Sequence, residues 1–251
     1  MCTAVILRRP EHEWPLLIAA NRDEMIDRPW LPPARHWPDR PETVGGQDTL
    51  SGGSWLGVND HGVVVGVLNR TGTLGPVDGK RSRGELVLEA LDHADASEAA
   101  EAMGNIDPHA YRSFNLFIAD DRDAYWLAAR NGAMSIKVYP VPEGVSILTS
   151  QDLNTERAPR IGTFRPLFQA AAAPDPAMDD WREWERLMAS GLPRPDDEPD
   201  EAMSIITDRG YGTVSSSLIA LPRKEPGAKT RWRFAAGRPG AAPYESVLPK
   251  D

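Results

Sequence analysis

The order of strand-like and helix-like segments is the feature that most limits what this chain can fold into. Short apolar runs typical of strands come first. Helical stretches, further strand-like runs, more helices and a last group of strand-like runs follow along the 251 residues. No repeat of fixed period interrupts that order. Strands and helices grouped in this way suit an α+β domain built in layers, so we expect one domain over residues 1–251.

Turn residues and apolar spacing place the individual elements. Two apolar runs near the N-terminus predict a hairpin, and so do the two runs on either side of residues 59–62. Helical spacing of apolar residues predicts a helix over residues 83–92, whereas the prolines of residues 25–44 predict an irregular loop. Four further strand-like runs joined by turns predict an antiparallel meander: residues 114–119, 124–129, 135–139 and 145–148.

The first hairpin carries the strongest chemical signal, because the only cysteine of the chain lies directly before it. Its strands, residues 3–7 and 15–20, would bring Cys2 beside the polar cluster Asn21-Arg22-Asp23-Glu24. A side chain as small as that of Cys2 lets a methionine aminopeptidase remove Met1. Cys2 would then carry a thiol and a free α-amine, whose reference pKa of about 7.7–8.0 makes it a usable base. A nucleophile activated by its own N-terminal amine is an established form of covalent catalysis.

The polar cluster suits such a nucleophile. Arg22 would lower the pKa of the thiol or bind a substrate carboxylate, and Asp23 or Glu24 would orient the amine. The alternative is that Cys2 is incidental at a frayed terminus and that the cluster is a solvated turn.

Composition and charge exclude several classes of protein. A net charge of −9 argues against a general nucleic-acid binder and against polybasic docking to anionic membranes. A single cysteine excludes an internal disulfide and a multi-cysteine zinc site, and the five histidines show no metal-ligand spacing. We therefore expect no metal and no other cofactor.

The lengths of the apolar runs indicate where in the cell the protein is expected to be. No apolar run approaches the roughly 18 residues of a membrane-spanning helix. Arg8, Arg9 and Pro10 end the first apolar run too early for a signal peptide. We therefore expect a cytoplasmic protein without a transmembrane segment, whose lone thiol stays reduced. The sequence makes no prediction of the oligomeric state.

Beyond these patterns, the chain resembles a known family along nearly its whole length. The start Met1-Cys2-Thr3 and the run Pro15–Glu24, which ends in Asn-Arg-Asp-Glu, are similar to the NRDE family, also named for transport and Golgi organisation protein 2. Further matching motifs follow in the expected order: Gly45-Gly46-Gln47-Asp48, Gly52-Gly53-Ser54-Trp55-Leu56-Gly57, Asn69-Arg70, Ser82-Arg83-Gly84, Phe114-Asn115-Leu116 and Tyr211-Gly212-Thr213. The resemblance implies an N-terminal-nucleophile (Ntn) hydrolase fold, a four-layer αββα sandwich of two antiparallel sheets. That fold is related to choloylglycine hydrolases and penicillin V acylases.

The resemblance also implies catalytic roles. Cys2 would be the nucleophile, with Arg22 and Asp23 beside it, and Asn69 would supply a side-chain amide to the oxyanion hole. A second amide would come from Asn154 or from Gln151.

Other residues depart from the family pattern or are expected to bind substrate. Ser150-Gln151 stands where the family more often has a serine–asparagine pair, and Val214 stands where it often carries an arginine. The expected substrate-binding residues are Asn21, Trp55, Arg70 and Gln151.

Two functions fit this resemblance. The first is an Ntn-type cysteine hydrolase or acyltransferase in which Cys2 attacks an amide or other acyl substrate. The second is a non-catalytic binding or carrier protein on the same fold, which holds a lipid, an acyl-CoA or a haem-like ligand. In both cases the expected partner is a small molecule and not a nucleic acid.

Overall fold

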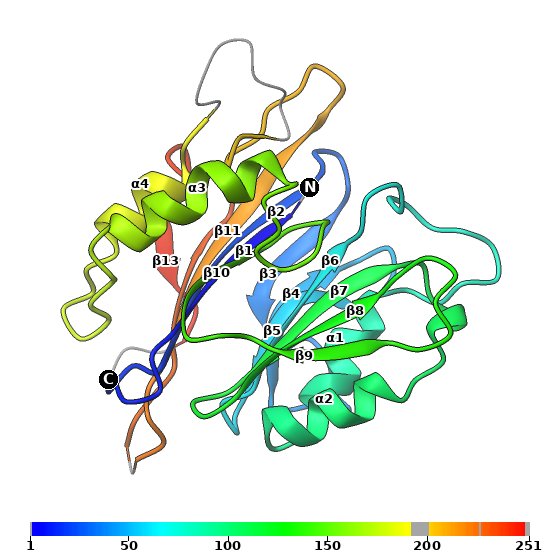
Figure 1. Cartoon of the computed structure of the whole chain (residues 1–251), viewed down its shortest axis with the longest axis horizontal. Coiled ribbons are helices and arrows are strands. Elements are labelled where there is room, and N and C mark those ends of the chain that lie inside the picture. The colour runs from blue at the N-terminus through cyan, green and yellow to red at the C-terminus, as the bar shows by residue number, and fades with distance from the viewer. Residues whose placement is uncertain (1, 192–200, 226, 249–251) are drawn as a thin grey trace. The chain divides into compact units, whose positions relative to one another are not determined.

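The chain divides into two compact units. The computed structural model describes residues 2–191, 201–225 and 227–248. The first unit contains Met1–Arg28, Pro142–Thr149 and Leu153–Asp251, and the second contains Pro29–Val141 and Ser150–Asp152. Each unit has its own antiparallel sheet and its own helices (Figure 1). The single domain expected from the sequence stays a prediction.

The first unit is built on a six-stranded antiparallel sheet in the order β10-β1-β2-β11-β12-β13. Thr3 pairs with Asn21 and Arg8 pairs with Leu16 in the central hairpin, which confirms the predicted N-terminal hairpin. The strands are β1 (Thr3–Arg8), β2 (Leu16–Met25), β10 (Gly144–Leu148), β11 (Tyr211–Leu221), β12 (Arg231–Ala235) and β13 (Tyr244–Ser246).

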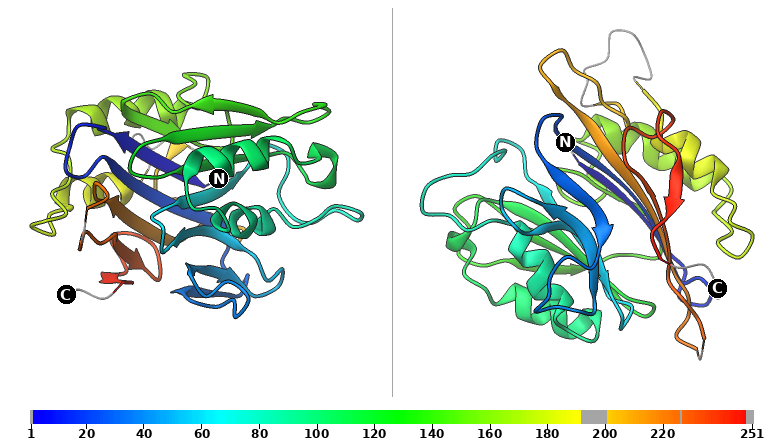
Figure 2. Two further views of the ribbon diagram at one scale, coloured as in Figure 1. Left: turned by 90° about the horizontal axis from the view of Figure 1, so that it is seen from below. Right: turned by 180° about the vertical axis from the view of Figure 1, so that it is seen from behind.

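Helices α3 (Pro159–Ala170) and α4 (Arg182–Met188) pack against one face of this sheet, as the views in Figures 1 and 2 agree. Helix α3 turns Ile161, Phe164 and Phe168 toward the sheet, and this helical spacing produces one apolar stripe. The ring of Phe168 meets that of Trp184 edge to face, with centroids 5.3 Å apart. Burial of each such side chain contributes about 1.5–3 kcal/mol, so this face holds the core of the unit.

The second unit is a seven-stranded sheet in which β3 to β9 follow one another in chain order. Its strands are β3 (Trp30–Ala34), β4 (Thr43–Asp48), β5 (Ser54–Asn59), β6 (Val64–Asn69), β7 (Phe114–Ala119), β8 (Ala124–Ala129) and β9 (Lys137–Pro140). Helix α1 (Gly84–Leu91) contacts β5 and β6, and α2 (Ala96–Gly104) contacts β7, β8 and β9. A short 3-10 turn, η1 (Pro108–Ala110), leads back to the sheet. The predicted helix over residues 83–92 is confirmed as α1.

The prediction of an irregular loop over residues 25–44 is wrong in part. Strand β3 lies within it and includes Pro32 and Pro33. Proline cannot donate to a sheet ladder, but β3 is the edge strand of its sheet, where a missing donor is tolerated. The ladder with β4 is also irregular between Leu31 and Ala34, which leaves the two prolines outside regular pairing.

The prediction of one four-stranded meander over residues 114–148 is also wrong in part. Strands β7, β8 and β9 form consecutive antiparallel pairs. Strand β10 pairs instead with β1 in the first unit, where Leu148 lies opposite Ala4. Strand propensity is a local property, whereas the partner of a strand is decided by distant residues.

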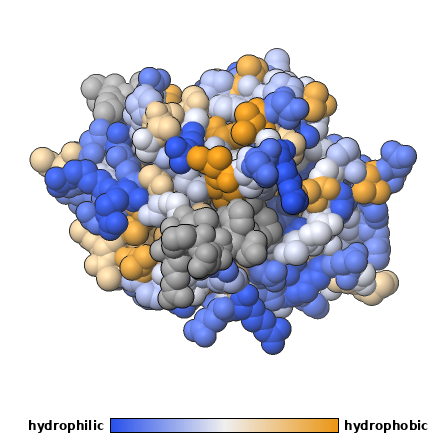
Figure 3. All heavy atoms as spheres, turned by 90° about the horizontal axis from the view of Figure 1, so that it is seen from above, coloured by the Kyte–Doolittle hydropathy of each residue, from blue (hydrophilic) through white to orange (hydrophobic). Residues whose placement is uncertain are grey.

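Surface hydropathy and helix length show how the described residues suit water or a membrane. The face shown in Figure 3 is mainly hydrophilic, with apolar side chains in small groups. Over residues 2–191, 201–225 and 227–248, every helix is too short or too polar to cross a bilayer.

Candidate functional site

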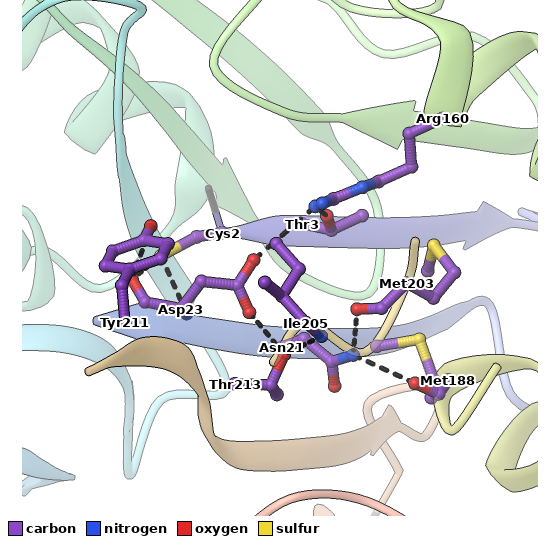
Figure 4. Close-up of polar contacts among 10 residues, drawn as sticks. All are labelled: Cys2, Thr3, Asn21, Asp23, Arg160, Met188, Met203, Ile205, Tyr211 and Thr213. Carbon is purple, nitrogen blue, oxygen red and sulfur yellow. Dashed lines mark hydrogen bonds and ion pairs between the residues drawn. The ribbon is translucent and has the colours of Figure 1, made fainter. Parts of the chain in front are cut away.

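Cys2 lies directly before β1, next to the backbone of Asp23 in β2 (Figure 4). The backbone N–H of Asp23 donates to the Cys2 Sγ at 3.4 Å, and the thiol donates to the Asp23 carbonyl oxygen at 3.5 Å. The register of the hairpin, with Thr3 opposite Asn21, produces this contact. The predicted placement of Cys2 beside the polar cluster is therefore confirmed. Met1 lies outside the described residues.

The Asp23 carboxylate is the centre of a buried polar cluster. The Thr213 hydroxyl donates to its Oδ1 at 2.6 Å, and Arg160 lies 3.5 Å from its Oδ2. Arg160 also donates to the Thr3 hydroxyl at 2.5 Å. The Tyr211 hydroxyl donates to the backbone carbonyl of Asp23 at 3.2 Å (Figure 4). Arg160 and Asp23 thus form an ion pair whose two side chains are both shielded from solvent.

Strand alternation explains which side chains join this cluster. In β2, Asn21 and Asp23 lie on the same face as Leu17 and Ala19, which belong to the core beneath α3 and α4. Arg22 lies on the other face. The four consecutive polar residues predicted to act together are therefore divided between two faces of the sheet.

Asn21 has a structural role in this arrangement. Its side-chain amide donates to the carbonyl oxygens of Met188 and Met203 at 3.0 and 2.8 Å. Both amide hydrogens are thus engaged, and they tie the end of α4 and the 201–204 segment to the sheet. The substrate-binding role of Asn21 stays a prediction, and the structure supplies this second reason for an asparagine here.

The environment of Cys2 changes the acidity of its thiol. Burial raises the pKa of the Cys2 thiol, and the negative charge of Asp23 raises it further. The hydrogen bond from the Asp23 backbone and the positive charge of Arg22 act in the opposite direction but are weaker. Because Arg22 is only 5% exposed, solvent ions screen its charge little from the Cys2 thiol. The thiol is therefore protonated near neutral pH and needs a base before it can attack.

Val214 marks an irregularity beside the site. Thr213 pairs with Asp23 and Ser215 pairs with Arg22, so Val214 is the extra residue of a bulge in β11. This bulge lies where β11 passes the polar end of β2. The cation that meets Asp23 is supplied by Arg160 of α3 instead.

Four expected residues lie in the second unit. Arg70 donates to the Asn115 Oδ1 at 2.6 Å and to the Asp152 Oδ1 at 2.7 Å. The side chain of Gln151 donates to the Thr71 hydroxyl at 3.0 Å. The remaining two are Asn69, which ends β6 opposite Phe114, and Trp55, whose ring meets that of Trp30 edge to face at 5.8 Å. Their roles in binding or catalysis stay predictions.

Asn154 closes a turn in the first unit. Its Oδ1 accepts from the backbone N–H of Ile147 at 2.8 Å, and its Nδ2 donates to the Ser146 hydroxyl at 3.0 Å. Its φ of 57° is left-handed, a conformation that asparagine tolerates better than most residues. These contacts account for an asparagine at this position without any catalytic role.

The sequence predictions missed Arg160, Thr213 and Tyr211 as partners of Asp23, and Thr3 as a partner of Arg160. One signal was available, because Arg160 falls on the same buried stripe of α3 as Ile161 and Phe164. A charged residue on an apolar stripe indicates a buried partner. Tyr211 and Thr213 belong to a recognised motif, but nothing local connects that motif to Asp23.

Comparison with known proteins places the chain in a family. The family model described as "Transport and Golgi organisation 2" matches residues 1–228. The chain belongs to this Transport and Golgi organisation 2 family. A relative from Homo sapiens, "Transport and Golgi organization protein 2 homolog", is 36% identical over 110 residues, which cover 42% of this chain and 38% of the relative. The Bos taurus homolog is 34% identical over 110 residues with the same coverage.

Solved structures show the fold of this family member. A penicillin V acylase from Agrobacterium tumefaciens has a TM-score of 0.58 at 16% identity, over 94% of this chain and 83% of that one. A Caenorhabditis elegans ortholog of N-acylethanolamine-hydrolyzing acid amidase has a TM-score of 0.54 at 16% identity, over 87% of this chain and 92% of that one. The mutant C2A conjugated bile acid hydrolase from Clostridium perfringens has a TM-score of 0.53 at 11% identity, over 100% of this chain and 97% of that one. The predicted α+β fold of the Ntn-hydrolase type, with two antiparallel sheets, is confirmed.

Proposed function

We propose that this protein is an Ntn-type cysteine hydrolase or acyltransferase that acts on a small amide or other acyl substrate. The observation that carries the proposal is the contact between Cys2 Sγ and the backbone of Asp23, next to the buried pair of Asp23 and Arg160. The fold supports it, because the solved relatives are named as an acylase, an amidase and a hydrolase. The bile acid hydrolase was solved with its second residue, a cysteine, replaced by alanine. Cys2 holds the second position here.

In the proposed reaction, removal of Met1 leaves Cys2 with a free α-amine. The Cys2 sulfur forms a bond to the substrate carbonyl carbon while the amine takes the thiol proton. The tetrahedral intermediate then breaks the C–N bond, and the leaving amine takes that proton away. Water attacks the resulting thioester and gives a proton to the α-amine. The C–S bond then breaks, the acid is released, and the α-ammonium group returns that proton to the Cys2 sulfur. An acceptor other than water would make the same enzyme an acyltransferase.

The raised pKa of the thiol supports the need for this amine. A thiol that stays protonated near pH 7 is a poor nucleophile unless a base lies beside it. An α-amine with a pKa of about 7.7–8.0 is suited to that task. Asp23 would then attract the ammonium group that forms during attack.

Among the candidate amides for the oxyanion hole, we favour Asn69. Within the described residues its side chain has no hydrogen-bond partner, whereas Gln151 and Asn154 already donate to Thr71 and Ser146. An amide with free donors can stabilise an oxyanion without losing an existing contact.

Mass spectrometry tests the proposal in two steps. The intact mass is expected to correspond to a chain that begins at Cys2. The protein would then be incubated with N-acylethanolamines, penicillin V and conjugated bile acids and quenched in acid to trap an acyl group on Cys2. We expect Cys2→Ala to abolish both the adduct and the product. The proposal would be overturned if Cys2→Ala, and also a chain whose Met1 is retained by an N-terminal extension, both turned over substrate as fast as the unaltered protein.

A second candidate is a carrier for a lipid, an acyl-CoA or a haem-like ligand. The same raised thiol pKa favours it, because a protonated thiol without a base would leave a bound ligand intact. Native mass spectrometry of protein purified from cells distinguishes the two. A retained ligand together with slow labelling of Cys2 by a thiol-reactive probe supports the carrier, and fast labelling contradicts it.

The cytoplasmic location stays part of the proposal. A reducing compartment would keep the lone thiol of Cys2 available. Fractionation of cells with compartment markers would show it, and recovery of the protein in an oxidising compartment would contradict it.

A further inference from the structure

A cavity in the second unit is lined by four cationic side chains. It has a volume of about 580 Å³ and lies among the segment after β6, the residues around η1 and the β8–β9 turn. Its cations are Arg70, Lys80, Arg112 and Arg130, and its lining within the described part of the chain includes no aspartate or glutamate. Such a concentration of positive charge is unexpected in a chain of net charge −9.

One carboxylate that is not part of the lining offsets part of this charge. Asp152 accepts from Arg70 through Oδ1 at 2.7 Å and from Arg130 through Oδ2 at 2.8 Å. Burial opposes its ionisation, but the hydrogen bonds from Arg130 and Arg70 lower the pKa of Asp152 below its ordinary value. Asp152 is therefore charged near neutral pH, and it holds the two guanidinium groups side by side.

The other two cations are held by neutral groups. Arg112 donates to three backbone carbonyl oxygens within residues 72–75, and Lys80 donates to the carbonyl oxygen of His109. Among the described residues, neither Arg112 nor Lys80 has an acidic partner. The carbonyl groups orient these charges without neutralising them, so the cavity keeps an excess of positive charge.

We propose that this cavity binds the phosphate or diphosphate group of a small molecule. After Asp152 is counted, three positive charges remain, which exceeds what a single carboxylate ligand would balance. A phosphate monoester carries about −1.5 to −2 at pH 7 and accepts hydrogen bonds on three oxygens. Guanidinium groups bind such oxygens in a bidentate manner, and a lysine adds a point charge. Thr71 and Ser113 add hydroxyl groups to the lining.

The proposal of an anion site does not depend on the chemistry at Cys2. The contacts that build it involve only residues of the second unit, and no step at the thiol is needed for an anion to bind. The binding measurement therefore succeeds or fails separately from the Cys2 assay.

Titration calorimetry of the full chain with inorganic diphosphate and with inorganic phosphate tests the proposal. We expect saturable one-site binding that weakens as salt is added. Lys80→Gln is expected to weaken it about tenfold or more, since a hydrogen bond to a charged group is lost. Arg122→Gln is the matched control, because Arg122 lies at the opposite end of β8, in the β7–β8 turn, and is expected to leave the affinity unchanged.

Three outcomes would overturn the proposal. The first is the absence of saturable binding of either anion. The second is equal weakening by Lys80→Gln and Arg122→Gln, which would indicate a general charge effect. The third is binding to phosphatidic acid vesicles that free diphosphate does not compete away, which would assign the site to a lipid surface. Lys80 is exposed, so Lys80→Gln is expected to fold, and urea unfolding of each variant checks this.

Discussion

Arg160 and Asp23 approach to 3.5 Å although they are 137 residues apart in the chain, and both side chains are buried. Strand β2 supplies the carboxylate and helix α3 supplies the guanidinium group. The pair therefore joins the helix to the sheet at the place where Cys2 contacts the strand.

We expect Arg160→Met to lower the free energy of unfolding by about 3–5 kcal/mol, because it leaves the Asp23 carboxylate buried without its cation. Urea unfolding measures this loss. In Arg160→Met with Asp23→Asn, the combined loss is expected to be smaller than the sum of the two single losses. Strictly additive losses would show that the two charges do not interact.

The pH dependence of Cys2 labelling tests the acidity of the thiol. Since only the thiolate reacts and burial raises the thiol pKa, the thiolate fraction at pH 7–8 is smaller than in free cysteine. We expect iodoacetamide to label a chain that retains Met1 more slowly than free cysteine, with the midpoint of the rate shifted to higher pH. Arg22→Gln is expected to shift it further in the same direction. A midpoint below that of free cysteine would contradict this prediction.

Replacement of Asn154 separates a structural role from a catalytic one. Asn154→Ala removes two hydrogen bonds and places alanine at a φ of 57°, so we expect a loss of about 2 kcal/mol in stability. Asn154→Gly keeps the backbone conformation and is expected to lose less. If turnover falls 100-fold in Asn154→Gly while its stability is nearly unchanged, Asn154 acts in catalysis and our structural assignment is wrong.

In contrast to Asn154, replacement of Asn69 is expected to affect turnover and not the stability of the fold. Asn69→Ala removes an amide whose donors are unengaged within the described residues, so the stability of the fold should change little. If Asn69 stabilises the oxyanion, its removal lowers kcat by about 10²–10³-fold on any substrate found for Cys2. Unchanged kcat would transfer this role to another donor.

Alanine substitutions at two glycines are expected to change the stability of the fold in opposite directions. A Cβ at Gly53 would lie 2.5 Å from the backbone of Gly84, so Gly53→Ala is expected to be destabilising by about 1–3 kcal/mol. Gly162 lies on the exposed side of α3, where the nearest atom is 4.0 Å from such a Cβ. Gly162→Ala is expected to stabilise by about 0.5–1 kcal/mol, because alanine favours the helix. Thermal unfolding compares the two variants, and destabilisation by Gly162→Ala would contradict the packing described here.

Part of the site was predictable from sequence because it depends on a short hairpin. The turn between β1 and β2 and the alternation of their apolar residues define the register. That register alone brings Cys2 to the backbone of Asp23. The same reasoning could not show that Asn21 and Asp23 point into the helix-covered core while Arg22 points away, because all four residues of the cluster are polar.

The sequence by itself determined the α+β class, the N-terminal hairpin and the position of Cys2, since each depends on residues close together in the chain. Only the tertiary structure decided that β10 pairs with β1, that Arg160 meets Asp23, and that Arg70 and Arg130 share Asp152. These contacts join residues far apart in the chain. Their energy depends on burial and on the geometry of a partner, neither of which a local sequence pattern contains.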